Sequence, residues 1–552
     1  MTGVRGGAVR RTAGVLALAV VPVAVLAVFF VLPVAGMVGR GLWPQGSFDP
    51  SGALDVLTRE RTGRVLAFTL LTSAAGTAGS LLLGLPTAWV LHRLALPGAR
   101  VLRALLLVPF VLPTVVVGVA FRELLGEAGP LGFLGLDGTP FAVVLALVFF
   151  NLAVVVRAVG AAWESLDPRP AEAAAALGAT PWQVWWTVTL PSLRPAVVSA
   201  ASVVFLFCAT AFGVVLTLGG LRYATVETEI YLLTTSLLDL EGAAALSILQ
   251  LVVVAVLLVL AQRLRATPDP RARRVAPRPR AVRRSDAPAL VVTGVALVLA
   301  ATPILTLVVG SLRTPDGFGL DNYVALQTRG SSGALAVPVT EALAVSLRTA
   351  VDATWMAVLL GLLVAVVVTQ RSRGRVERTV RSGLDAFFML PLGVSAVTLG
   401  FGLLVTLDSG LLDLRSSPLL VPVAQALVAL PLVVRTLAPV LASIDDRQRQ
   451  AAASLGAGPF RTLLVVDLPV VWKPLLAAAG FAFAVSLGEF GATSFLFRED
   501  APTVPVVIFR LIGRPGEGNY AMALAASVVL AAVTTLVVLA VERLRVPSVG
   551  AF

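Results

Sequence analysis

The sequence is poor in charged and reactive residues. Only 13% of its 552 residues are charged, against about 25% in an ordinary soluble domain, and 57% are hydrophobic. This composition excludes a soluble enzyme and a disordered chain, and it predicts a membrane protein with several spans. The single cysteine, Cys208, excludes an internal disulfide and a zinc cluster. The single histidine, His92, does not by itself indicate a metal site or a catalytic triad. We expect it to be a residue at the membrane–water interface.

Lysine is almost absent, because Lys473 is the only one in the chain. A phosphate-binding loop needs the pattern GxxxxGK followed by Ser or Thr, and Lys473 instead precedes a proline. We therefore expect no nucleotide, metal or other cofactor in this chain and no catalytic residues of its own. The 43 Lys and Arg exceed the 31 Asp and Glu, but they lie mostly in short segments between apolar runs. Arginine in such segments more often sets membrane orientation than binds nucleic acid.

Apolar runs long enough to cross a bilayer recur from one end of the chain to the other. A spanning helix needs about 20 mostly apolar residues. The sequence predicts an all-α protein with about twelve such helices in two groups of six, the first of them uncleaved. The predicted spans are 13–37, 65–91, 101–121, 141–162, 195–219, 244–262, 288–311, 343–369, 383–407, 418–441, 474–497 and 520–541.

The arginines predict the orientation of these spans. If both termini are cytoplasmic, most basic residues fall in the cytoplasmic segments, as the positive-inside rule requires. Residues 263–287 are rich in Arg and Pro and show no apolar period, which is typical of a linker at the cytoplasmic surface. This linker joins residues 1–262 to residues 288–552. A nucleic-acid or anionic-lipid site in the linker is an alternative on charge alone.

One cytoplasmic segment occurs twice. EAAAALGATPWQVWWTVTLP begins at Glu172, and QAAASLGAGPFRTLLVVDLP begins at Gln450, 278 positions later. Each copy follows the fourth predicted span of its half, so the chain is predicted to be a parallel repeat about the membrane normal. Within the copy, Gly178 can turn the chain after a short helix, Thr180 can cap the next helix, and Pro191 is expected to end the segment.

These residues resemble the coupling-loop motif of permease subunits in ATP-binding-cassette importers, and the resemblance covers nearly the whole chain. It implies two tandem six-helix permease units of the type I, MetI-like kind, in a multi-pass protein of the bacterial cell membrane. Coupling loops at 169–191 and 447–469 would each dock on one of two cytoplasmic ATPase subunits, and a solute-binding protein is expected outside. The residues implied in docking are Glu172, Ala173, Ala174, Leu177, Gly178, Ala179, Pro181, Gln450, Ala451, Ala452, Leu455, Gly456, Ala457 and Pro459. Gln450 stands where the motif has glutamate, so the two contacts are not chemically equal.

Polar residues inside predicted spans are candidates for the solute path, because ionisable groups are costly in hydrocarbon. Glu489 is the strongest candidate, and a structural hydrogen bond to a neighbouring helix is the alternative role. The other candidates are Ser486, Thr493, Thr210 and Thr217. Glu227 and Glu229 belong to no motif and are expected to be solvated.

The fused two-unit layout is most similar to thiamine and iron(III) permeases. Oxyanion permeases of the sulfate or molybdate type share the GEFGA segment around Glu489, so this carboxylate does not decide the solute. A twelve-helix secondary transporter is the main alternative from another class, but it would need more intramembrane acidic residues. A membrane-embedded enzyme is disfavoured, because the spans contain no paired His, Cys or carboxylate groups.

Overall fold

The computed structural model describes residues 18–43, 46–220, 222–264, 280–369, 375–407 and 414–544. Within these ranges, ten helices are long and apolar enough to cross a membrane, or eleven if one bent pair counts as a single span. The all-α prediction with repeated helical units is therefore confirmed. Most of the linker, from 265 to 279, lies outside the described residues.

The described chain divides into two compact units. Unit 1 comprises the described residues within 1–54, 230–248 and 323–550, and unit 2 those within 55–229 and 249–322. Four helices extend across these boundaries: α3 (Ser51–Thr58), α12 (Val226–Thr235), α13 (Leu240–Leu264) and α15 (Asp321–Val324).

Unit 2 is built on the long helix α4, which packs against α7 and α10. Helix α14 also packs on α4 and on α6. The elements of unit 2 are α4 (Glu60–Arg93), α5 (Ala99–Val111), α6 (Thr114–Leu125), η2 (Gly132–Leu134), α7 (Pro140–Glu164), α8 (Arg169–Ala176), α9 (Pro181–Val184), η3 (Trp185–Thr189), α10 (Leu190–Ala209), α11 (Gly213–Leu218), η4 (Arg284–Asp286), α14 (Ala287–Ser311) and a hairpin of β1 (Arg313–Thr314) and β2 (Gly317–Phe318).

Unit 1 is built in the same way on α16, which packs against α19 and α22. Its elements are η1 (Ala27–Val31), α2 (Leu32–Leu42), η5 (Ala325–Gln327), η6 (Ser331–Gly333), α16 (Val339–Thr369), α17 (Arg375–Phe388), η7 (Leu390–Gly393), α18 (Ala396–Thr406), α19 (Leu420–Ser443), α20 (Asp446–Ser454), α21 (Pro459–Thr462), η8 (Leu463–Asp467), α22 (Leu468–Gly488), α23 (Thr493–Leu496), α24 (Val504–Gly513) and α25 (Glu517–Leu544).

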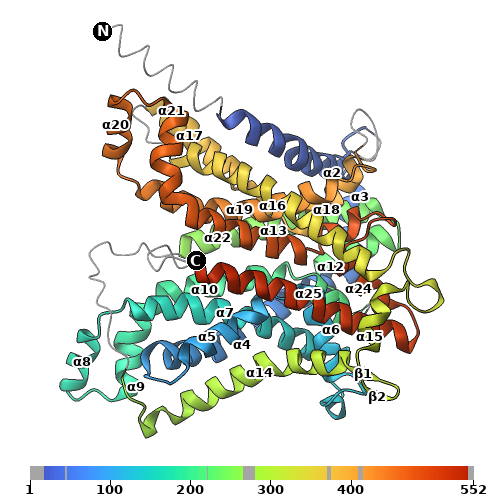
Figure 1. Ribbon diagram of the computed structural model, residues 1–552, viewed down its shortest axis with the longest axis horizontal. Coiled ribbons are helices and arrows are strands. Elements are labelled where there is room, and N and C mark those ends of the chain that lie inside the picture. The colour runs from blue at the N-terminus through green and yellow to red at the C-terminus, as the bar shows by residue number, and fades with distance from the viewer. Residues whose placement is uncertain are drawn as a thin grey trace. The chain divides into compact units, whose positions relative to one another are not determined.

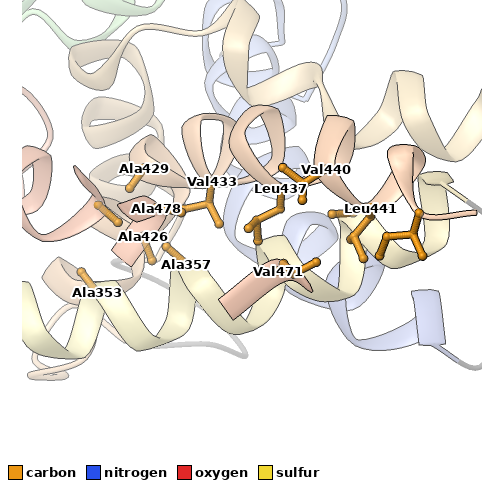
Figure 2. Packing of buried hydrophobic residues seen from close by; sticks show 13 residues of the cluster. Ala353, Ala357, Ala426, Ala429, Val433, Leu437, Val440, Leu441, Val471 and Ala478 are labelled. Carbon is orange, nitrogen blue, oxygen red and sulfur yellow. The ribbon is translucent and has the colours of Figure 1, made fainter. Parts of the chain in front are cut away.

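Small residues allow the central helices of unit 1 to approach closely. Figure 2 shows the buried cluster where α16, α19 and α22 meet, in which Ala353, Ala357, Ala429 and Ala478 alternate with Val and Leu. Alanine and glycine at such contacts give membrane helices the van der Waals packing that the lipid does not supply. A Cβ on Gly361 would lie only 2.5 Å from Val433 on α19.

The same contact recurs in unit 2, where a Cβ on Gly84 of α4 would lie 2.6 Å from Val155 on α7. A second tertiary contact is also repeated. The amide of Val226 donates to Thr69 Oγ1 at 3.0 Å in unit 2, and the amide of Val504 donates to Ser346 Oγ at 2.8 Å in unit 1. The sequence repeat is therefore a structural repeat in its helix packing.

The opening helix of each repeat lies in the unit that contains most of the other repeat. Helix α2 packs on α18 in unit 1, and α14 packs on α4 and α6 in unit 2. The compact units therefore divide the chain differently from the sequence halves, whose limits at 262 and 288 stay a prediction.

Four predicted spans differ from the observed helices. The 101–121 span is bent by 104° between α5 and α6, because Leu112 precedes Pro113 and takes an extended conformation. The 383–407 stretch forms α17, η7 and α18 instead of one helix. The 195–219 and 474–497 spans end early, at Ala209 and Gly488, and short helices follow each break.

Candidate functional site

The first coupling loop is a helix–turn–helix at one end of unit 2, where Figure 1 labels α8 and α9. Helix α8 ends in a left-handed turn at Gly178, whose φ is +89°. The Gly178 amide donates to the Ala175 carbonyl at 3.0 Å, and the Ala179 amide to the Ala174 carbonyl at 3.1 Å. This pair of bonds satisfies the last carbonyls of α8 in the Schellman arrangement, and a glycine adopts it without strain.

The predicted cap of the next helix is confirmed. The Gln183 amide donates to Thr180 Oγ1, and the Gln183 side chain accepts from the Thr180 amide at 2.8 Å, which completes a capping box. Pro181 follows at the first helical position, as expected.

The second coupling loop repeats this geometry in unit 1, where Figure 1 labels α20 and α21. Gly456 has a φ of +83°, and the Ala457 amide donates to the Ala452 carbonyl at 3.0 Å. Asp445 accepts from the Arg447 amide at the start of α20, as Asp167 accepts from the Arg169 amide in the first loop. The start of the loop helix and the glycine turn that ends it are therefore built by the same local hydrogen bonds in both copies, whereas the capping box of Thr180 has no counterpart, because the equivalent residue is Gly458.

Pro191 does not end the segment, contrary to the sequence expectation. The helix continues through it from Pro181 to Ala209, and the turn just before it, η3, is a π-helix. The second copy has the same π-helix, η8, just before Pro469. A proline lacks an amide donor and its ring crowds the carbonyl four residues earlier, so the wider π turn lets the helix pass it.

Apolar side chains are exposed on both loops. Leu177 is 89% exposed and its counterpart Leu455 is 87% exposed. Trp182 and Trp186 of the first loop are also exposed, and their rings contact each other edge to face. Glu172 of the first loop and Gln450 of the second are exposed as well. Large apolar groups held in water at a rigid turn are typical of a surface that another protein covers.

Glu489 lies at the break between α22 and α23 and is only 7% exposed. Its carboxylate accepts hydrogen bonds from the amides of Ala492 at 2.7 Å and Thr493 at 3.0 Å, and from the Thr493 hydroxyl. Gln425 of α19 in turn donates to Thr493 Oγ1 at 3.3 Å. Glu489 thus satisfies the first amides of α23, which the helix break would otherwise leave without acceptors.

The remaining path candidates are distributed over the two units. Ser486 is buried one turn before Glu489, in unit 1. Thr210 and Thr217 belong to unit 2, and their hydroxyls donate to the carbonyls of Leu206 at 2.9 Å and Gly213 at 2.7 Å. The structure therefore brings Ser486, Glu489 and Thr493 together in one place.

Glu227 and Glu229 are buried, so the expectation that they are solvated is wrong. Glu227 is fully buried and accepts from Gln250 Nε2 at 2.8 Å. Glu229 is paired with Arg61 through both carboxylate oxygens, one of them 2.8 Å from the guanidinium. Arg61 lies 168 positions earlier in the chain, and no local pattern in the sequence signals this pair.

His92 is not simply an interfacial side chain. Its Nδ1 lies 2.7 Å from Glu164 Oε1, and Arg103 donates to the same oxygen at 3.2 Å. These three residues hold together the ends of α4, α5 and α7 just before the first coupling loop.

Comparison with known proteins gives matches along both repeats. Residues 80–274 and 357–546 each match the family model described as "Binding-protein-dependent transport system inner membrane component". The thiamine transport system permease protein ThiP of Escherichia coli K12 is 29% identical and covers 77% of this chain and 78% of its own length. ThiP of Brucella abortus is 27% identical over 85% of both chains. The molybdenum transport system permease protein ModB of Mycobacterium tuberculosis is 38% identical, over 42% of this chain and 88% of its own.

Proposed function

The chain belongs to the family of binding-protein-dependent transport system inner membrane components, and we propose from this premise that it is the fused permease subunit of a thiamine importer. The importer-permease function follows from the two family matches, which together cover most of the chain. The solute is supported by the ThiP relatives, because they extend over both repeats.

An oxyanion of the molybdate type is the second candidate solute. The observation in its favour is the higher identity of ModB, 38% over 242 residues. That match covers less than half of the chain, and it reflects the repeated unit more than the fused layout. Thiamine is therefore preferred. Iron(III) is the other candidate from the sequence, and none of the three relatives named above is an iron(III) permease.

We infer that the motor is a separate pair of ATPase subunits and that the two coupling loops are their docking sites. The observation that carries this inference is the pair of exposed leucines, Leu177 and Leu455, each held at a left-handed glycine turn. A leucine side chain loses about 2 kcal/mol of favourable burial when it stays in water. A groove on each ATPase that covers one leucine would recover this energy.

Replacing both leucines tests the docking. In Leu177→Asp with Leu455→Asp, we expect the ATPase to be lost from the purified membrane complex. The matched control is Leu237→Asp, because Leu237 is 63% exposed but lies outside both loops. Retention of the ATPase by the double variant at the level of the control would refute the docking sites.

The solute is tested with the complete importer in nanodiscs. ATP hydrolysis is measured with the external binding protein loaded in turn with thiamine, molybdate and iron(III). We expect thiamine to stimulate hydrolysis severalfold and the other two to leave it at the basal rate. Stimulation by molybdate alone would replace the thiamine assignment with the oxyanion one.

The proposed topology places both termini and both coupling loops in the cytoplasm of a bacterial cell, with a solute-binding protein on the other side. The bias of arginine toward these segments supports it. A fluorescent protein that matures only in the cytoplasm, fused after residue 552, should fluoresce. A dark fusion that is stably inserted would reverse the orientation.

A further inference from the structure

The second coupling loop is tied to its own unit by a buried ion pair. Arg449, on α20, donates from Nε to Asp467 Oδ1 of η8 at 2.8 Å. It also donates from a terminal nitrogen to the carbonyl of Leu441, near the end of α19, at 3.2 Å. The Arg449 side chain is 23% exposed and that of Asp467 is 11% exposed. One guanidinium therefore connects the loop helix, the preceding span and the start of the following span.

The first coupling loop cannot form this pair. The equivalent positions, 278 residues earlier, are Ala171 and Thr189. The first loop has an aromatic stack instead, in which the rings of Trp163 and Trp185 lie 5.6 Å apart with an interplanar angle of 26°. Trp163 is at the end of α7 and is 2% exposed, and Trp185 begins η3. The stack thus joins the preceding span to the π-helix.

The positions of these two tryptophans are occupied by leucines in the second copy. Leu441 and Leu463 both line a cavity of about 100 Å³, together with Asp467 and Val471. Figure 2 shows Leu441 and Val471 in the buried cluster of α16, α19 and α22. Where the first copy has stacked rings, the second has leucines that line this cavity. The second copy instead has the Arg449–Asp467 ion pair at this place.

We propose that Arg449 is the positioning residue of the second coupling loop. It holds this loop in place through Asp467 and the Leu441 carbonyl, whereas Trp163 and Trp185 hold the first loop. The two loops are then held by different interactions, one electrostatic and one aromatic. Movement of a docked ATPase at the second loop passes through Arg449 into η8 and α22, the helix that ends just before Glu489. This last step rests on the proposed docking of an ATPase; the positioning role does not.

An exposed ion pair would be worth almost nothing and would not position a loop. The Arg449–Asp467 pair is different in two respects. Both side chains are mostly buried, and the guanidinium also binds a carbonyl at a helix end, where a cation is favoured. Removal of one partner leaves the other charge in a poorly hydrated place, which is costly.

Hydrogen exchange on the full chain in nanodiscs, without any ATPase, tests the positioning role. In Arg449→Ala we expect amide exchange in 446–467 to rise about tenfold, with no change in 168–189 of the same sample. Trp185→Leu should give the reverse pattern. In the charge-swapped double variant, Arg449→Asp with Asp467→Arg, the rate of amide hydrogen exchange in 446–467 should return most of the way to the wild-type rate. A general folding defect would not permit this recovery.

Three results would overturn the proposal: no rise in hydrogen exchange in Arg449→Ala, an equal rise in both loops, or no recovery in the charge-swapped double variant.

The coupling step is measured separately, in the complete importer, as solute transported per ATP hydrolysed. We expect this ratio to fall about tenfold in Arg449→Ala while the ATPase stays bound through Leu455. An unchanged ratio would limit Arg449 to a structural role. If the ATPase does not bind the wild-type chain at all, the proposed docking fails, whereas the exchange results still decide the positioning role.

Discussion

Replacement of Glu489 separates two roles that a buried carboxylate in a membrane protein can have. If its function is to cap α23, then Glu489→Ala leaves the amides of Ala492 and Thr493 and the Thr493 hydroxyl without their acceptor. Each unsatisfied buried donor costs about 1–3 kcal/mol. The two amides alone therefore predict a loss of about 2–6 kcal/mol in the free energy of unfolding.

The conservative variants should each give a smaller loss. Glu489→Gln keeps one carbonyl oxygen but presents an NH2 group where the second oxygen accepted, so one amide loses its partner, at a cost of about 1–3 kcal/mol. Thr493→Val keeps both amide bonds but removes the hydroxyl that accepts from buried Gln425, so that one donor loses its partner, also at a cost of about 1–3 kcal/mol. We expect Glu489→Ala to be the most destabilised of the three.

Stability can be measured as the temperature at which half of the purified chain in detergent loses its monodisperse peak on gel filtration. Solute uptake is measured in parallel in proteoliposomes with the ATPase. The capping role predicts that loss of uptake follows loss of stability across the three variants. If Glu489→Gln and Glu489→Ala keep wild-type stability but abolish uptake, the capping argument is refuted and the carboxylate acts on the solute path.

Two further predictions concern turns and buried charge. Gly178→Val and Gly456→Val should each strain a left-handed turn by about 1–2 kcal/mol and so reduce ATPase binding, measured by co-purification. Asparagine at either position should be tolerated, because it adopts this conformation more readily. Wild-type ATPase binding by both valine variants would contradict this prediction. Arg61→Ala should destabilise unit 2 by about 1–3 kcal/mol, because buried Glu229 loses the hydrogen bonds of Arg61, whose own side chain is half exposed. Faster labelling of the buried thiol of Cys208 by a maleimide would measure this loss, and an unchanged labelling rate would argue against it.

Much of the coupling loops could be predicted because their structure is local. The turn at Gly178, its repeat at Gly456 and the capping box of Thr180 each depend on residues within a few positions of one another. The passage of the helix through Pro191 was missed, although the signal was present. Both copies have the same Leu-Pro pair after the same number of residues, and the π turn before each proline is also local.

The sequence indicates that Glu489 is important but does not determine its role. Its position in an apolar run marked it as costly and therefore important. Whether it faces a solute or a helix end depends on where α22 breaks, and the break places the amides of Ala492 and Thr493 within reach of the carboxylate. The carboxylates of Glu227 and Glu229 were mispredicted for a related reason, since their partners Gln250 and Arg61 are distant in sequence.

The sequence by itself determined the class of this protein, its repeat and the two left-handed turns at Gly178 and Gly456. Hydropathy selects membrane insertion one segment at a time, and short turns are set by hydrogen bonds between near neighbours, so both can be predicted from the order of residues. Only the tertiary structure decided that α2 and α14 each lie in the unit that holds most of the other repeat, and that Arg449 pairs with Asp467 in one copy while Trp163 stacks on Trp185 in the other. These features depend on which helices pack together, and in an apolar environment many pairings of alanine- and leucine-rich surfaces have nearly equal energy.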